Sequence, residues 1–276
     1  MTDKMVEAYL KALENEERAA ATVEKYRRAL LSFAAFLSGA AVTPEMIRLW
    51  KDDLRARNYV PSTINTYLAA LNGFFRFCGW ADCRARFLKI QRRLFRDSKR
   101  ELTRAEYERL VAAAEAAGDR GLALLMETIC STGIRVSEVQ YITVEAAKNG
   151  KTEIALKGKI RTILLPSKLC RKLLKYAARQ KTASGAIFRT KSGKAMSRYQ
   201  IWSKMKKLCV RAGVDAGKVF PHNLRHLFAT AFYRAYKDIV KLADVLGHSS
   251  IETTRIYLVT SAAEHRRQLE QLKFVS

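Results

Sequence analysis

Residues 84–107 read RARFLKIQRRLFRDSKRELTRAEY, and this stretch decides how the chain is divided. Residues 84–100 contain eight arginines and lysines, opposed only by Asp97. Thr103, followed three residues later by Glu106, is the pattern of a helix start in which hydroxyl and carboxylate each bond a free backbone N–H. We therefore predict a domain boundary at about residue 98, with a basic linker before it.

The first predicted domain, residues 1–98, has the pattern of helices and none of strands. Apolar side chains recur at steps of three and four residues, the spacing of one buried helix face, at Ile64, Tyr67, Leu68, Leu71 and Phe75. Thr43 followed by Pro44 marks a further helix start. We expect a bundle of four or five helices.

The second predicted domain, residues 99–276, is expected to be helical around one short β-hairpin. Residues 153–156 and 160–165 are strand-like runs, and Lys157-Gly158-Lys159 lies between them as the hairpin tip. Two more helix starts are expected, at Ser197 with Gln200 and at Ser249 with Glu252. The fold class is therefore predicted as mainly α with a small β-hairpin.

The chain is strongly basic, with 51 Lys and Arg against 26 Asp and Glu and a formal net charge of +25. The excess is +8 in residues 1–100 and +17 in residues 101–276. Such an excess predicts a polyanionic partner, with nucleic acid as the first choice. A membrane surface is disfavoured, because the sequence has no apolar run of 18 residues and no signal peptide.

The cysteines and histidines give no pattern of a metal or disulfide site. The five cysteines are scattered and form no CxxC pair, which indicates free thiols in a reducing cytoplasm. His222 and His226 are four residues apart, but no acidic or thiol ligand lies near them in the sequence. We expect a cytoplasmic protein that uses neither a metal nor another cofactor.

Four short segments contain side chains that could carry chemistry. Taken singly, each has an ordinary explanation, such as an exposed arginine after a turn, an exposed turn lysine or a packed tyrosine. Together, two arginines, a lysine, two histidines and a tyrosine are the groups that metal-free phosphoryl transfer needs. They are Arg135 in STGIRVSEV, Lys157 in the hairpin tip, His222 and Arg225 in PHNLRHLFAT, and His248 and Tyr257 in LGHSSIETTRIY.

In this order and spacing, the segments resemble the signature of the tyrosine recombinase (phage integrase) family over essentially the whole chain. The resemblance implies that TGIRVSE holds the first catalytic arginine, Arg135, and an accessory acid, Glu138. It places the hairpin lysine at Lys157 in ALKGKIRT, and Lys159 remains an alternative for that role. It assigns the HxxR motif to His222 and Arg225, the LGH histidine to His248 and the nucleophile to Tyr257.

The same resemblance implies a fold and an activity. VPSTINTYLAALNGFFRF is similar to the family's helical core-binding domain, so residues 1–98 would bind DNA and residues 99–276 would hold the catalytic site. Tyr257 would cut DNA through a 3′-phosphotyrosyl link without ATP, as in two-domain Xer-like or mobile-element recombinases. DNA contacts are expected at Arg86, Lys89, Arg92, Arg93, Arg96 and Lys159.

The implied partners are double-stranded DNA with inverted half-sites and a homotetramer on two synapsed duplexes. An accessory directionality factor is a further expected partner. The outcome could be integration, excision, inversion or resolution. Two alternatives stay open at this stage: a non-catalytic basic DNA-binding protein, and relaxation of DNA in the manner of a type IB topoisomerase.

Overall fold

The computed structural model describes residues 1–90, 100–156, 159–190, 192–257 and 262–272. The chain divides into two compact units, Met1–Arg92 and Arg93–Ser276. The boundary expected near residue 98 falls among residues 91–99, outside the described ranges, so its position stays a prediction.

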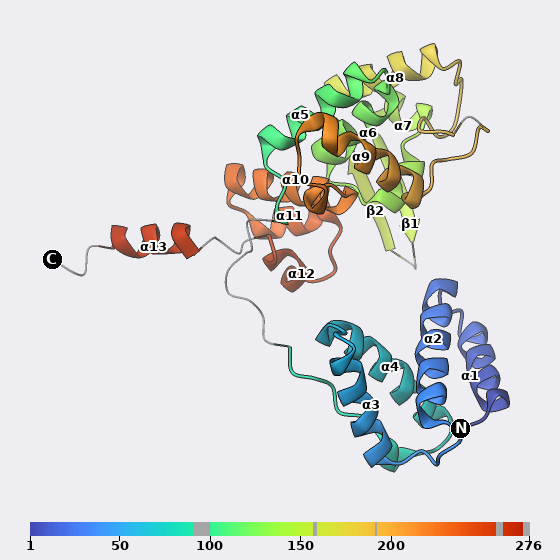
Figure 1. Cartoon of the computed structure of the whole chain (residues 1–276). Helices are drawn as coiled ribbons and strands as arrows, with labels where there is room; N and C mark the ends of the chain where they lie inside the picture. Colours follow the sequence, from blue (N-terminus) through green and yellow to red (C-terminus); the bar gives the residue numbers. More distant parts are fainter. Residues whose placement is uncertain (91–99, 157–158, 191, 258–261, 273–276) are drawn as a thin grey trace. The chain divides into compact units, whose positions relative to one another are not determined.

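The first unit is built of helices throughout its described residues (Figure 1, blue to teal). Its elements are α1 (Asp3–Asn15), α2 (Ala20–Leu37), α3 (Pro44–Ala56), α4 (Pro61–Phe77) and the short 3₁₀ helix η1 (Ala81–Cys83). The expected start of α3 is confirmed, because Thr43 Oγ1 accepts from the backbone N–H of Met46 at 3.2 Å. The expected helical bundle is confirmed as well.

The core of this unit is aromatic. Trp50 is fully buried, with the Phe33 ring 5.0 Å away and the Tyr67 ring stacked on it at 6.0 Å. The face of α4 predicted to be buried supplies much of the remaining core: Ile64, Leu68, Leu71 and Phe75 are at most 1% exposed. Burial of large apolar side chains of this kind is the main source of stability in a small helical domain.

Two asparagines of α4 hold the start of the basic segment in place. Asn72 accepts from the backbone N–H of Ala85 (2.8 Å) and donates to its carbonyl (3.0 Å). Asn65 makes the same pair of bonds to Leu88, at 2.8 and 2.9 Å. The two side chains are seven residues apart, so they lie on one face of the helix. The backbone after η1 is therefore fixed along α4 without any strand partner.

The described part of the second unit consists of helices around one hairpin (Figure 1, green to red). Its elements are α5 (Arg104–Ala116), α6 (Arg120–Thr132), η3 (Val136–Tyr141), α7 (Val144–Asn149), β1 (Lys151–Leu156), β2 (Lys159–Leu164), α8 (Ser167–Arg179), α9 (Arg198–Ala212), η4 (Ala216–Lys218), α10 (Pro221–Tyr236), α11 (Ile239–Leu246), α12 (Ile251–Arg255) and α13 (Ala262–Gln271). The predicted fold class is confirmed.

The hairpin pairs β1 with β2 in an antiparallel register that places Leu156 opposite Lys159 and Ile154 opposite Arg161. Lys159 thus belongs to strand β2, whereas the sequence pattern predicts it in the hairpin tip. Lys157 and Gly158 lie outside the described residues. Because side chains alternate across a strand, Arg161 shares its face with Ile163, which is buried.

Two of the three helix starts expected in this unit are confirmed. Thr103 with Glu106 and Ser197 with Gln200 both form complete capping boxes. The third prediction, Ser249 with Glu252, is wrong by one residue. Ser250 has the extended backbone of an N-cap and accepts from Glu252 N–H at 3.2 Å. The turn that ends α11 runs on to His248, whose backbone N–H donates to the Ala243 carbonyl at 3.0 Å.

Helix α6 lies at the centre of the unit and packs against α5, α8, α9 and α10. Leu125, Met126 and Ile129 on it are fully buried. The helix ends at Gly133, whose φ of +65° favours glycine. None of the described helices is long and apolar enough to cross a membrane.

Gly133 and Gly150 form a matched pair for a stability test, since each follows a helix with a positive φ, +65° and +68°. A Cβ on Gly133 would lie 2.4 Å from Phe228 Cδ1, whereas a Cβ on Gly150 would meet nothing within 4 Å. Both alanine variants incur about 1 kcal/mol of backbone strain, and we expect Gly133→Ala to lose roughly 1–3 kcal/mol more through overpacking. Urea unfolding measures the difference, and equal losses would contradict this packing.

Candidate active site

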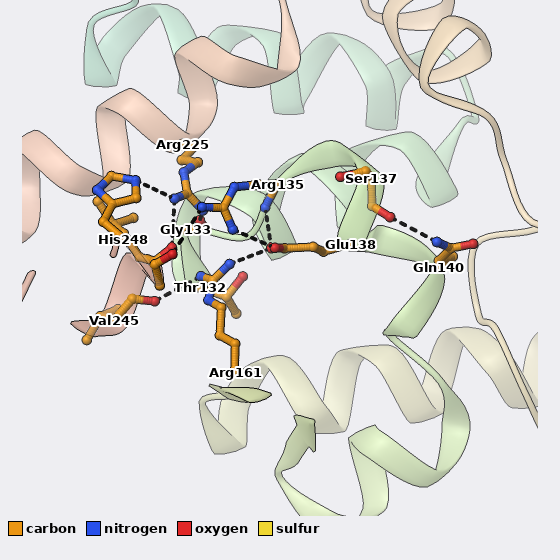
Figure 2. Close-up of polar contacts among 12 residues, drawn as sticks. Thr132, Gly133, Arg135, Ser137, Glu138, Gln140, Arg161, Arg225, Val245 and His248 are labelled. Carbon is orange, nitrogen blue, oxygen red and sulfur yellow. Dashed lines mark hydrogen bonds and ion pairs between the residues drawn. The ribbon is translucent and has the colours of Figure 1, made fainter. Parts of the chain in front are cut away.

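Three arginines converge on the C-terminal end of α11 (Figure 2). Each donates to one of three consecutive backbone carbonyls: Arg161 to Val245 (2.9 Å), Arg225 to Leu246 (2.8 Å) and Arg135 to Gly247 (3.2 Å). The last carbonyls of a helix receive no hydrogen bond from an N–H of the same helix, and they form the negative end of its dipole. The end of α11 is therefore a natural anchor for positive side chains.

Arg225 lies in the first turns of α10 and is only 2% exposed. It also donates to the carbonyl of Gly133 at 2.5 Å, so it joins the end of α6 to the end of α11. Burial lowers the pKa of Arg225 to about 10, and the charge of Arg135 adds to the effect. The Tyr257 phenol acts in the opposite direction on that pKa, and its ring is stacked on His248, which contacts Arg225. At neutral pH Arg225 remains a cation.

Arg135 follows the Gly133 turn and is bonded to the carboxylate of Glu138. Its Nη1 is 2.8 Å from Glu138 Oε1, and its backbone N–H donates to Oε2 at 2.8 Å. Glu138 is 2% exposed; burial alone would raise its pKa, but the bonds from Arg135 and the charge of Arg161 outweigh burial and lower the pKa. The Arg135 side chain is 42% exposed and so remains available to a ligand.

His248 stands just beyond α11 and is held from both sides. Its Nε2 is 3.0 Å from Arg225 Nη2, and its Nδ1 is 2.8 Å from Thr254 Oγ1. Because a guanidinium can only donate, Nε2 must accept and Nδ1 carries the proton. Burial and the nearby arginines, Arg225 first, lower the pKa of His248 to about 4, so the ring is neutral at pH 7.

His222 lies in the first turn of α10 and, with Arg135 and Arg225, lines a cleft of about 690 Å³. Partial burial lowers the pKa of His222, and the charge of Arg225 adds to this. A neutral imidazole beside two guanidiniums can accept a proton while the cations bind an anion. The cleft is completed by Ile134, Val136, Ser137, Arg198, Tyr199, Trp202, Phe220 and Pro221.

Tyr257 is 3% exposed and is not among the residues that line the cleft. Its ring is stacked parallel to His248 at 6.0 Å and contacts His226 at 5.0 Å. It shares an apolar cluster with Ala229, Leu242 and Leu246. The phenol is thus adjacent to the arginine cluster but covered by packing.

The structure describes only some of the expected DNA-contact residues. Arg86 and Lys89 are exposed on the segment that Asn65 and Asn72 hold. Lys157 and the basic residues Arg92, Arg93 and Arg96 lie outside the described residues. For Lys159 the strand is described but the side chain is not. His226 does not join His222, because its Nε2 faces Glu101 Oε1 at 3.5 Å.

Sequence reasoning missed Arg161, which is the third arginine at the end of α11. The signal was present, since strand alternation assigns Arg161 to the same face as buried Ile163, where a charged residue is unexpected. It also missed Arg198, Tyr199 and Trp202 on α9, which line the cleft. No pattern in the sequence connects that helix with the other motifs.

Both units of the chain match sequence models of known protein families. Residues 100–264 match the sequence model of the phage integrase family. Residues 6–82 match that of the phage integrase N-terminal SAM-like domain. The chain belongs to the phage integrase family. It is a tyrosine-type site-specific recombinase, an enzyme class that acts on DNA.

Relatives of this recombinase are similar over nearly their whole length. Tyrosine recombinase XerA of Pyrococcus furiosus is 29% identical, with 98% of this chain and 94% of the relative covered. Tyrosine recombinase XerD of Xanthomonas axonopodis pv. citri is 30% identical, with 90% of this chain and 89% of the relative covered. The similarity to Xer proteins therefore extends over both units of this chain.

Solved structures support the fold of the recombinase. A lambda integrase (75-356) dimer bound to a COC′ core site matches with a TM-score of 0.75 at 17% identity, over 93% of this chain and 94% of that one. XerH bound to difH substrate in a pre-cleavage complex matches with a TM-score of 0.71 at 20% identity, over 97% and 84%. At these identities the likeness concerns the fold alone.

The lowered pKa of His248 predicts a pH dependence of stability. In the unfolded chain a histidine has a pKa of about 6.5, above the folded value of about 4. Between these values the unfolded state binds more protons than the folded state. The contribution of His248 to the free energy of unfolding is therefore fully present above about pH 6.5 and is lost as the pH drops toward 4. From pH 7 to 5 the loss is about 1 kcal/mol, allowing for the partial exposure of the ring.

His248→Gln is the matched variant for this test, since an amide can accept from Arg225 and donate to Thr254 without titrating in this range. We expect urea unfolding at pH 7 and pH 5 to show a smaller loss in the variant than in wild type. The same loss in both proteins would contradict a neutral, buried His248.

Proposed function

We propose that this recombinase cuts and rejoins DNA at the cleft formed by Arg135, His222 and Arg225, with Tyr257 as the nucleophile. The observation that supports the proposal is the convergence of two guanidiniums and a neutral imidazole on one cleft, beside a buried tyrosine. Two cations suit the two non-bridging oxygens of a phosphodiester, because a guanidinium bonds such oxygens in a bidentate manner.

In the first step the Tyr257 oxygen bonds to phosphorus and the bond to the 5′ oxygen breaks. The phenolic proton passes to His222, and Lys157 protonates the departing 5′ oxygen. Arg135 and Arg225 stabilise the charge on the five-coordinate phosphorus. The product is a 3′-phosphotyrosyl link, and attack by a partner strand's 5′ hydroxyl reverses the step without ATP.

The burial of Tyr257 adds one requirement. A side chain that is 3% exposed cannot reach a phosphate in the cleft from its place between two histidines. The segment after α11 therefore moves when DNA binds, and His248 exchanges its contact with Arg225 for one with the phosphate. Glu138 supports Arg135 throughout as an accessory residue.

The proposed substrate is double-stranded DNA with inverted half-sites, bound by two synapsed pairs of protomers as a homotetramer. Arg86, Lys89, Arg92, Arg93, Arg96 and Lys159 contact its backbone and grooves, and the division at about residue 98 separates core binding from catalysis. A directionality factor could bias the outcome among integration, excision, inversion and resolution. The cytoplasmic location stays a prediction.

The first test is covalent trapping. Wild type and Tyr257→Phe are incubated in EDTA with DNA from the flanks of the gene, then denatured and examined for protein–DNA adducts. We expect an adduct from wild type alone, because only the phenol oxygen can form the link. An adduct from the phenylalanine variant, or tight binding without any adduct in wild type, would overturn the proposal.

Arg225→Ala tests the phosphate site. Loss of one charge-stabilising donor typically slows such a step by about a hundredfold or more. We therefore expect the adduct to form at least that much more slowly, measured in single turnover on a nicked site. Near-normal cleavage by this variant would contradict the assignment.

The C-terminal helix α13 tests the assembly. Leu269 and Leu272 are 57% and 56% exposed, which suits docking on a neighbouring protomer. Deleting residues 263–276 is expected to abolish cooperative binding to paired half-sites while leaving binding to a single half-site intact, as measured by gel shift. Unchanged cooperativity would remove a role for this helix between protomers.

A further inference from the structure

Arg161 has an unusual environment for an arginine. Its side chain is 11% exposed, and it faces inward from β2 beside apolar Ile163. Its Nη1 is 2.6 Å from Glu138 Oε2, and its Nη2 donates to the Val245 carbonyl at 2.9 Å. Its Nε is buried and has no hydrogen-bond partner among the described residues. The guanidinium is thus largely buried at the centre of the site, and Arg161 is not among the residues that line the cleft.

Glu138 is shared between two arginines. Arg135 bonds Oε1 and Arg161 bonds Oε2, so each carboxylate oxygen faces one guanidinium (Figure 2). The arginines differ in exposure: 42% of the Arg135 side chain is accessible, against 11% for Arg161. Arg135 therefore faces the cleft, and Arg161 faces the interior.

Counting formal charges shows what the inner arginine contributes. Arg135 and Glu138 alone would form a neutral pair, and the carboxylate would reduce the attraction of Arg135 for an anion in the cleft. With Arg161 the group of three carries +1. Charges at contact distance in a partly buried site interact strongly, so the second cation restores the attraction that Glu138 would otherwise cancel.

Fold stability alone is a poor reason to keep an arginine at this position. Buried ion pairs contribute little net stability relative to well-packed apolar residues, and a buried N–H without a partner is unfavourable. The cross-strand neighbour of Arg161 is Ile154, itself buried, so an apolar residue would suit the environment. The charge is therefore the property that the site requires.

Arg161 also supports the turn that carries His248. A Cβ on Gly247 would lie 2.3 Å from Arg161 Cδ, so the glycine is needed for the close approach as well as for its φ of +62°. The side chain lies directly against the end of α11. It can therefore fix both the carboxylate that orients Arg135 and the backbone that leads to His248.

We propose that Arg161 is a positioning residue of the recombination site, which neutralises the buried Glu138 carboxylate so that Arg135 keeps its full charge for the scissile phosphate. The proposal rests on the phosphate-binding role given above to Arg135. Arg161 touches no reacting atom and acts through Glu138 and Arg135.

A double-substitution cycle separates charge balance from simple support of the fold. Arg161→Met leaves Glu138 opposite Arg135 alone, and we expect covalent adduct to form at least about tenfold more slowly on a nicked site. Arg161→Met with Glu138→Gln removes both charges, and we expect adduct formation several times faster than with Arg161→Met alone. If Arg161 only supported the fold, losing a second partner would slow the reaction further. A double variant no faster than the single one would overturn the proposal.

A second readout does not depend on DNA cleavage. The charged and titratable groups that face His248 are Arg225 and His222 from α10, Arg135 before η3 and Arg161 from β2. Helix α12 contributes the neutral Thr254, and the turn after α12 contributes the stacked ring of Tyr257. We expect the midpoint of the His248 titration, followed by NMR in the full chain, to rise in Arg161→Met, to fall in Glu138→Gln and to return near the wild-type value in the double variant.

The His248 midpoints test the role of Arg161 separately from the proposed function. If wild type forms no adduct, the proposed function fails, yet the His248 midpoints still decide the charge balance. If Arg161→Met leaves the midpoint unchanged, or the double variant stays as high as Arg161→Met, the charge-balancing role fails even when wild type cleaves DNA normally.

Two further variants serve as controls, one for loss of an arginine outside the site and one for the charge at position 161. Arg109→Met removes another arginine that donates to carbonyls at a helix end, those of Ala212 and Gly213 at 3.0 and 3.2 Å, outside the site. We expect it to leave adduct formation and the His248 midpoint unchanged. Arg161→Lys keeps the charge but not the two-pronged geometry, and we expect it to react faster than Arg161→Met. A lysine variant as slow as the methionine variant would argue against a role for the charge.

Discussion

The site depends on the carbonyls at the end of α11, which no N–H of the helix itself bonds. Three consecutive oxygens, those of Val245, Leu246 and Gly247, hold three guanidiniums that come from β2, α10 and the turn after α6. Elements far apart in sequence are thereby fixed around one point. Because the carbonyls are backbone groups, any side-chain change that leaves α11 intact preserves the anchor. The cations that it holds help to lower the pKa of His222 and His248.

Much of this fold could be predicted from short-range patterns. Helix starts marked by Thr43, Thr103 and Ser197 lie where their capping groups place them, since a cap is a local interaction. The buried face of α4 followed from its spacing. The ordered motifs identified the family, and Arg135, Arg225 and His248 do lie together at the end of α11.

The remainder depends on contacts between distant segments, which no local pattern reports. The cap of α12 is at Ser250 and not at Ser249, after a turn that a bond from His248 N–H back to the Ala243 carbonyl closes. The cover over Tyr257 comes from α10 and α11, and the partner that orients Glu138 from below comes from β2. Strand alternation could have pointed to Arg161, but only the bond from its side chain to the end of α11 reveals what it touches.

The asparagine pair of α4 has a consequence for which changes the basic segment tolerates. Asn65 and Asn72 bond only main-chain atoms of Leu88 and Ala85, whereas the side chains of Arg84, Arg86 and Lys89 point outward. The asparagines thus determine the backbone path of this segment, and the exposed basic side chains determine its charge. Substitutions at the outward positions leave the asparagine bonds intact, so the contacts proposed for Arg86 and Lys89 can change, in evolution or in an engineered variant, while the backbone path stays the same.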